Sequence, residues 1–189
     1  MSHSINFKNT FAKELSEICE KFIPSGFSKS EMLIKNYKLA NELGLSEEFV
    51  DSRECLDIFS GVSVPKSSIP IAQAYSGHQF GHFNPRLGDG RAMLIGELNA
   101  KDIQLKGIGI TPFSRRGDGK SSLGPVLREY VISEFMHSIN IPTTRSLFAL
   151  KTNENVFRET NQPGGVLARV AKSHIRIGTF EYALSLIHI

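Results

Sequence analysis

The first third of the chain has apolar residues at helical spacing. Four of them recur at steps of three and four residues: Phe11, Leu15, Ile18 and Phe22. Such spacing places side chains on one face of a helix. The pattern predicts helices over residues 10–22 and 29–44, the second capped by Gly44, and a short third helix over residues 46–55.

After residues 61–70, which are rich in Ser, Pro and Gly and predict a linker, the pattern changes to strands. Residues 91–98 and 102–108 alternate like strands and are separated by only three residues, 99–101. This is the length of a hairpin connection. Two further apolar runs, 146–151 and 165–171, also predict strands. The polar segment between them, which contains Pro163 and Gly164, is expected to be a loop.

One long helix is predicted between these two pairs of strands. It runs from residue 122 to residue 139, with Ser121 as its N-cap and Pro125 in its first turn. The order hairpin, loop, helix, strands predicts an α+β fold. We expect a mainly helical extension and linker over residues 1–70, followed by a small antiparallel sheet with a helix over residues 71–189.

Composition and charge narrow the functional classes. The 189 residues are 40% hydrophobic and 22% charged, which is typical of a globular protein, and the net charge of +3 comes from scattered residues. No basic stripe for nucleic acid is evident. The start, MSHSINFKNTFAKEL, lacks a signal-peptide pattern, and no apolar run is long enough to span a membrane. Cys19 and Cys55 have no CxxC spacing. We therefore expect a soluble cytoplasmic protein that binds neither membranes nor nucleic acid.

A short glycine-containing motif precedes the first predicted hairpin. Gly88 and Gly90 leave the backbone N–H groups accessible to an anion, and Arg91 adds a guanidinium group suited to phosphate oxygens. The alternative is a simple tight turn. The motif alone does not decide between an anion site and a turn.

Lys106 lies inside an apolar predicted strand. Alternation places Gln104, Lys106 and Ile108 on one side of that strand. Glu129, in the middle of the long helix, is expected to share a face with apolar residues and thus to need a partner, which Lys106 can provide. Such a lysine–glutamate pair holds nucleotide phosphates in protein kinases. The alternatives are an exposed strand lysine and a glutamate at a solvated helix edge.

The apolar residues expected beside Glu129 are Val126 and Ile132.

The loop FSRRGDGKSS, at residues 113–122, concentrates cations and glycines before a helix N-terminus, which favours an anion. The end of this loop matches the end of a Walker A motif. However, Ser114 occupies the position where the motif requires its first glycine, so the Walker A interpretation fails. Asp118 and Gly119 remain candidate nucleotide contacts.

Arg169, in the last predicted strand, and Arg176 could converge on one polyphosphate. Two unrelated surface arginines are the alternative. His78 and His82 have the i, i+4 spacing of a helical metal pair, but Gly81 between them weakens a helix, so a structural role is expected.

Taken together, four segments of the chain resemble the selenoprotein O family of protein adenylyltransferases, and the resemblance extends from about Lys8 to Tyr182. The segments are AYSGHQFGHFNPRLGDGRAMLIGE, QLKGIGITPFSRRGDGK, REYVISEFMHSINIPTTRSL and LARVAKSHIRIGTFE.

The resemblance implies a protein-kinase-like fold that binds ATP in a flipped orientation, with Mg²⁺ or Mn²⁺. Its members transfer AMP to Ser, Thr or Tyr hydroxyls of protein substrates. Site residues carried over from the family are eight nucleotide contacts and a supporting glutamate: Gly88, Gly90, Arg91, Lys106, Asp118, Gly119, Arg169, Arg176 and Glu129.

The family's general-base aspartate and metal ligands are expected beyond residue 189, in a C-terminal lobe that this chain does not contain. The terminal LSLIHI does not resemble the family. We therefore expect an inactive N-terminal fragment with exposed apolar surface and poor solubility. The alternatives are an atypical kinase and a non-catalytic ATP-binding or interaction module. The missing V-A-I-K pattern before Lys106 disfavours an ordinary kinase.

Overall fold

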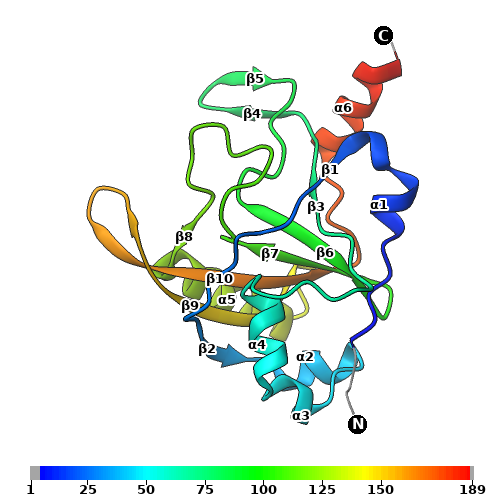
Figure 1. Cartoon of the computed structure of the whole chain (residues 1–189). Helices are drawn as coiled ribbons and strands as arrows, with labels where there is room; N and C mark the ends of the chain where they lie inside the picture. The colour runs from blue at the N-terminus through cyan, green and yellow to red at the C-terminus, as the bar shows by residue number, and fades with distance from the viewer. Residues whose placement is uncertain (1–4, 188–189) are drawn as a thin grey trace.

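Eight strands form one antiparallel sheet through the middle of the molecule, in a computed structural model that describes residues 5–187 (Figure 1). Their order is β1-β3-β6-β7-β10-β9-β2, and β8 pairs with β10. The strands are β1 (Cys19–Lys21), β2 (Glu31–Lys35), β3 (Ile71–Gln73), β6 (Ala92–Leu98), β7 (Lys101–Lys106), β8 (Ser121–Ser122), β9 (Arg145–Phe157) and β10 (Asn161–Ala171). The predicted α+β class with an antiparallel sheet is confirmed.

Short helices surround the sheet, and a separate hairpin stands above it in Figure 1. The hairpin consists of β4 (Gly77–Gln79) and β5 (His82–Asn84). The helices are α1 (Thr10–Glu14), the 3₁₀ turn η1 (Ser16–Ile18), α2 (Tyr37–Glu42), α3 (Glu47–Val50), α4 (Arg53–Phe59), α5 (Leu123–Ser138) and α6 (Ile177–Ile187).

The two faces of the sheet bury different partners. On one face, α2, α3 and α4 close the main core, in which the rings of Phe59 and Phe148 meet edge to face with centroids 4.7 Å apart. On the other face, Val126 of α5 packs against Ala149 of β9 and Leu167 of β10. The sheet is therefore covered on both sides, and α5 is the helix that lies next to β9 and β10.

The predicted first hairpin is confirmed as β6 and β7. Its connection is shorter than expected, because Lys101 already belongs to β7. The turn consists of Asn99 and Ala100, whose φ angles of 48° and 58° are both positive. This is the backbone conformation of a type I′ turn, which matches the twist of the flanking strands.

The second predicted pair of strands also exists, but it is longer. The strands β9 and β10 continue toward a turn at residues 158–160, so the loop expected around Pro163 and Gly164 is wrong. These two residues lie within β10, at a register shift between Pro163 and Gly165. An irregular register accommodates a proline, which cannot donate to the ladder.

Two of the predicted N-terminal helices are wrong in part. The helix over 10–22 ends at Glu14, because the chain then turns to pair Cys19 with Gln73 of β3. The helix over 29–44 contains only α2, since its first half forms β2 and pairs with β9. In both cases long-range strand pairing overrides a local helical pattern. Gly44 follows α2 with φ 80°, as a C-cap glycine does.

The other helix predictions need smaller corrections. The helix expected over 46–55 is two helices, α3 and α4, because the Ser52 hydroxyl accepts from the Cys55 N–H and starts the second one. The long helix is confirmed as α5, but Ser122 rather than Ser121 occupies its N-cap position. Ser121 instead pairs with Gly165 as part of β8.

The division of the chain at residue 70 stays a prediction about domains. In the described residues, segments from both sides of that position share one sheet and one hydrophobic core. Between residues 5 and 187, no helix is long and apolar enough to cross a membrane.

Apolar side chains are exposed along α6, as expected. They are Ile177, Phe180, Leu184, Leu186 and Ile187. The last two residues of the LSLIHI segment lie outside the described residues, as do the first four of MSHSINFKNTFAKEL. The poor solubility expected from such a surface stays a prediction.

A half-buried carboxylate ties α5 to the rest of the fold. Glu134 accepts hydrogen bonds from Arg145 Nε at 2.9 Å, from the Ser146 N–H at 2.9 Å and from Asn36 Nδ2 at 2.8 Å. Burial alone would raise the pKa of Glu134, but these bonds, led by the one from Arg145, lower it. The side chain thus joins α5, β9 and the start of α2.

We expect Glu134→Ala to lower the free energy of unfolding by about 3 kcal/mol, because the buried Arg145 loses its partner. Since the folded-state pKa is lowered, this contribution is present above the unfolded-state pKa of about 4.3 and is lost as the pH falls through the folded-state value. Urea unfolding at neutral and acidic pH measures the difference. Glu154→Ala is the control, because its exposed pair with Lys120 is worth under about 1 kcal/mol. Equal losses of stability from the two substitutions would contradict the stabilising role given to Glu134.

Candidate functional site

A cavity of about 390 Å³ opens between the loop before β6, the strands β7 and β10, and the segment that leads into α6. Six of the residues selected from the sequence line it together, although they span almost ninety positions: Gly88, Gly90, Arg91, Lys106, Arg169 and Arg176. The other lining residues are Tyr75, Gln79, Leu87, Asp89, Ala92, Phe113, Ser114 and Arg115.

Two cations of this cavity share one carboxylate. Lys106 Nζ donates to Glu129 Oε2 at 2.5 Å, which is the strand–helix pair expected from the sequence. Arg169 Nε donates to the other oxygen, Oε1, at 2.6 Å. The three side chains are only 19%, 30% and 16% exposed for Lys106, Glu129 and Arg169. Glu129 therefore fixes both cations at the inner end of the cavity.

Burial and the neighbouring charges shift the pKa values of Lys106 and Glu129. Burial, and then the neighbouring Arg169, lower the pKa of Lys106. For Glu129, burial acts to raise the pKa, but the charges of Arg169 and Lys106 outweigh it and lower the pKa. With Lys106 and Arg169 charged, two cations face the Glu129 carboxylate, and one positive charge is not neutralised within the group.

Two details of the expected pattern around this group are wrong. Ile108 does not share the side of Lys106, because Gly107 (φ 89°) interrupts the alternation and Ile108 joins the main core beside Leu105. Ile132 is 55% exposed and does not share the face of Val126. Six residues turn a helix through 600°, which leaves the two positions about 120° apart.

The glycine loop packs tightly against an aromatic ring. A Cβ atom on Gly88 would lie 2.3 Å from the ring of Phe113, and Gly88 has φ 64°. A Cβ atom on Gly90 would lie 3.1 Å from the carbonyl oxygen of Phe113. Packing and backbone conformation both require glycine at position 88. Arg91 lies at the edge of the cavity with an exposed side chain.

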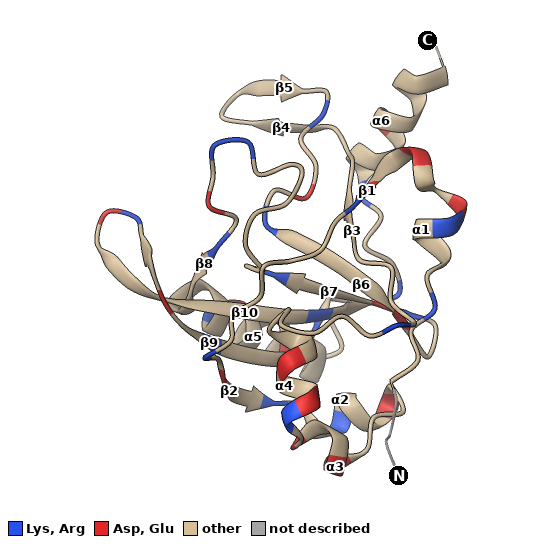
Figure 2. Ribbon diagram, viewed as in Figure 1, with Lys and Arg blue, Asp and Glu red and all other residues tan. Residues whose placement is uncertain are grey.

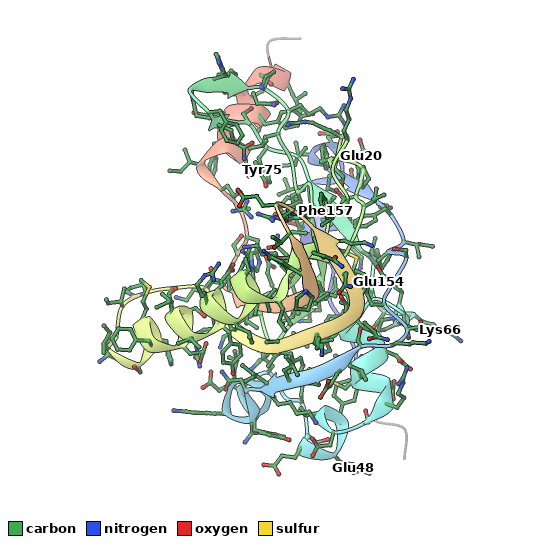
Figure 3. The ribbon with its side chains drawn as sticks, turned by 90° about the vertical axis from the view of Figure 1, so that its left-hand side faces the viewer. Glu20, Glu48, Lys66, Tyr75, Glu154 and Phe157 are labelled. Carbon is green, nitrogen blue, oxygen red and sulfur yellow. The ribbon has the colours of Figure 1, made fainter. Side chains whose placement is uncertain are left out.

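Arg176 reaches the cavity from the segment before α6. Its guanidinium carbon lies 4.9 Å from the centre of the Tyr75 ring, and Nη2 lies 3.6 Å from Asp89 Oδ1. Figure 3 shows Tyr75 beside this segment. Within the described residues, Arg176 Nε is buried and has no hydrogen-bond partner. Such an orphaned donor beside a polar cavity is available to a ligand.

Asp118 and Gly119 lie outside the residues that line the cavity. Asp118 accepts two hydrogen bonds from Arg158, at 2.9 and 3.0 Å, and these bonds lower the pKa of Asp118. Gly119 is buried with φ 65°, and a Cβ atom there would lie 1.9 Å from the Gly109 carbonyl oxygen. Their assignment as nucleotide contacts stays a prediction.

Positive charges outnumber negative ones in the cavity lining. Five cationic side chains line it, against the single carboxylate of Asp89: Arg91, Lys106, Arg115, Arg169 and Arg176. Figure 2 marks Lys and Arg positions on β7, on β10 and on the loop between β7 and β8 in blue. Such a lining attracts a multiply charged anion.

Comparison with known proteins identifies the family of this chain. The family model described as "Protein adenylyltransferase SelO" matches residues 2–187. This chain belongs to the SelO family. It is similar to proteins named "Protein nucleotidyltransferase YdiU" from Anoxybacillus flavithermus (50% identity), Bacillus cytotoxicus (51%) and Mycolicibacterium smegmatis (48%). The matches cover 97%, 94% and 95% of this chain but only 39%, 37% and 38% of the relatives. The chain thus spans a little over a third of their length.

Three lining residues of this SelO-family cavity that contact its other members were not selected from the sequence: Tyr75, Asp89 and Phe113. Gln104 was also missed; it lies outside the lining but hydrogen-bonds to both Asp89 and Arg169. Asp89 stands between two selected glycines and Gln104 two positions before Lys106, so their position in the chain was a usable signal. Tyr75 and Phe113 carried no such signal, because only the fold brings them to the glycine loop.

Between residues 5 and 187, no three His, Cys, Asp or Glu side chains are grouped as metal ligands would be. His78 and His82 lie on the two strands of the β4–β5 hairpin, and the His78 ring contacts Phe83 with centroids 5.1 Å apart.

Proposed function

We propose that this chain is the nucleotide-binding part of a protein adenylyltransferase and has the architecture of a kinase-like N-lobe. The whole protein would transfer AMP from ATP to Ser, Thr or Tyr hydroxyls of protein substrates. The observation that carries the proposal is the group of Lys106, Glu129 and Arg169 in a cationic cavity of a SelO-family chain. The proposed location is the cytoplasm, which suits the two free cysteines.

In this proposal the cavity holds the β- and γ-phosphates of ATP. Lys106, Arg169 and Arg176 would bind the phosphate oxygens by charge-assisted hydrogen bonds. Gly88, Gly90 and Arg91 would lie against the same triphosphate, and Asp118 and Gly119 would contact the nucleotide from the following loop. The α-phosphate would then face the acceptor hydroxyl, and pyrophosphate would leave.

Glu129 limits what the cavity can bind tightly. Its carboxylate neutralises the charge of one of its two partners, Lys106 and Arg169. Tight binding therefore requires an anion with several negative charges, which can replace bound solvent and also interact with Arg176. A triphosphate meets this requirement better than a monophosphate. The general base and any Mg²⁺ or Mn²⁺ ligands are, in this proposal, groups outside residues 1–189.

Nucleotide binding by the chain is the first test. Isothermal titration of the 189-residue protein should show that ATP binds and that AMP binds at least about tenfold more weakly, because AMP lacks the two phosphates assigned to the cavity. Equal affinities for ATP and AMP, or no binding of ATP, would contradict the phosphate assignment.

The transfer reaction is tested in a chimera. Residues 2–187 replace the matching segment of the Anoxybacillus flavithermus relative, to which they are 50% identical. After incubation with ATP and Mg²⁺ or Mn²⁺, intact mass spectrometry should detect protein that has gained the mass of AMP. A gain of one phosphate would instead identify a kinase, and ATP binding without any transfer would favour a non-catalytic module.

A further inference from the structure

Asp89 is a buried carboxylate at the wall of the cavity. Its residue is 2% exposed, and its two carboxylate oxygens accept three hydrogen bonds. The Tyr75 hydroxyl donates to Oδ1 at 3.1 Å, while the Gln73 N–H and Gln104 Nε2 donate to Oδ2 at 3.3 Å each. Two of the three donors, Tyr75 and Gln104, are side chains, and the third is the backbone N–H of Gln73.

These contacts lead to two of the arginines that line the cavity, Arg169 and Arg176. Gln104, which donates to Asp89, accepts from Arg169 Nη1 at 3.1 Å through its own oxygen. Tyr75, which also donates to Asp89, presents its ring to Arg176. Arg176 Nη2 itself lies 3.6 Å from Asp89 Oδ1, which is too long for a hydrogen bond but close enough for attraction. Asp89 therefore contacts the residues that hold the guanidinium groups of both Arg169 and Arg176.

The environment of Asp89 is costly for a carboxylate. Burial raises its pKa, and the attraction of Arg176 offsets this only in part. A group that only anchored a loop could use a neutral side chain at lower cost. The carboxyl group lies beside a cavity lined by cations and 3.6 Å from Arg176 Nη2, so its contacts point to a role toward the arginines rather than in the loop alone.

We propose that Asp89 is a positioning residue of the nucleotide site: it orients Arg176 directly and through Tyr75, and Arg169 through Gln104. The ion pair with Arg176 is loose, so the guanidinium donors, including the buried Nε, stay available to phosphate oxygens. This inference rests on the proposed binding of a triphosphate in the cavity. It assigns Asp89 no contact with the nucleotide.

The test uses Asp89→Asn in the 189-residue chain, with ATP as the probe. Removal of a negative charge beside an anion site would, by charge alone, tighten ATP binding. Loss of positioning would weaken it, by about fivefold or more. The sign of the change thus separates the two roles. Asp57→Asn, on α4 and paired with Arg53 away from the cavity, is the matched control and should change the affinity by less than about twofold.

A double-mutant cycle with Arg176→Ala shows whether Asp89 acts through that arginine. In the Arg176→Ala background, Asp89→Asn should weaken ATP binding by a clearly smaller factor than in the wild-type chain. The NMR signal of the Arg176 Nε–H group should also shift in Asp89→Asn without nucleotide, which a general loss of stability would not cause. If Asp89→Asn does not fold, Tyr75→Phe replaces it in the same cycle, because it removes only the hydroxyl that donates to Asp89.

The outcomes separate this inference from the proposed function. If the wild-type chain does not bind ATP, both fail. If the wild-type chain binds ATP while Asp89→Asn binds equally well or more tightly, or if the two substitutions act independently, Asp89 is not a positioning residue and the proposed function still stands.

Discussion

Lys106→Met is expected to weaken ATP binding by about 10-fold to 100-fold, because a charge-assisted hydrogen bond to a phosphate is lost. The substitution removes the ammonium group but keeps an unbranched side chain of similar length in the strand. Glu129 keeps Arg169 as its partner, at 2.5 Å, so the carboxylate is not left alone. Isothermal titration with ATP measures the change.

The matched control for this prediction is Lys101→Met. Lys101 begins the same strand, and its ammonium group lies 3.5 Å from Glu42, away from the cavity. We expect this control to change the affinity by less than about twofold. If Lys106→Met bound ATP as tightly as the wild-type chain, the cavity would not hold the phosphates.

Gly119→Ala is expected to lower the free energy of unfolding by about 3 kcal/mol or more, since it combines an unfavourable backbone conformation with a steric clash. Its φ is 65°, and the added Cβ atom would lie 1.9 Å from the Gly109 carbonyl oxygen. The main-chain atoms of two packed loops would have to move apart. For a chain of this size, the loss corresponds to a fall in melting temperature of about 6–12 °C.

Gly44→Ala separates the two causes. Gly44 also has a positive φ, 80°, but a Cβ atom there meets nothing within 4 Å. We expect it to cost only about 1 kcal/mol, the backbone contribution alone. Thermal unfolding of both variants measures the difference. If Gly119→Ala were as stable as Gly44→Ala but bound ATP more weakly, Gly119 would be a nucleotide contact rather than a packing residue.

The parts of the fold that the sequence predicted well depend on neighbours in the chain. The β6–β7 hairpin has two alternating strands and a short connection at Asn99 and Ala100, and α5 has a long run of helix-forming residues before Pro142. These signals lie within one element, so local propensity was sufficient. The strand β2 was predicted as helix, because nothing in residues 31–35 shows that β9 lies alongside.

The candidate site shows the same division between local and distant signals. Lys106 and Glu129 could be paired from the sequence, since a strand lysine and a mid-helix glutamate beside apolar residues each called for a partner of opposite charge. The network around Asp89 could not be predicted. Its members come from β3 and the segment that follows it, from the loop before β6 and from β7, and their hydrogen bonds exist only once the sheet has formed.

By itself, the sequence determined the residue types that a phosphate site needs and their order: Gly88 to Arg91, Lys106, Glu129, Arg169 and Arg176. The tertiary structure decided which of them meet. It places six of the selected residues around one cavity and leaves Asp118 and Gly119 outside its lining, in contact with Arg158 and with the Gly109 backbone. The physical reason is that charge and glycine content belong to single residues, whereas convergence depends on strand order and register.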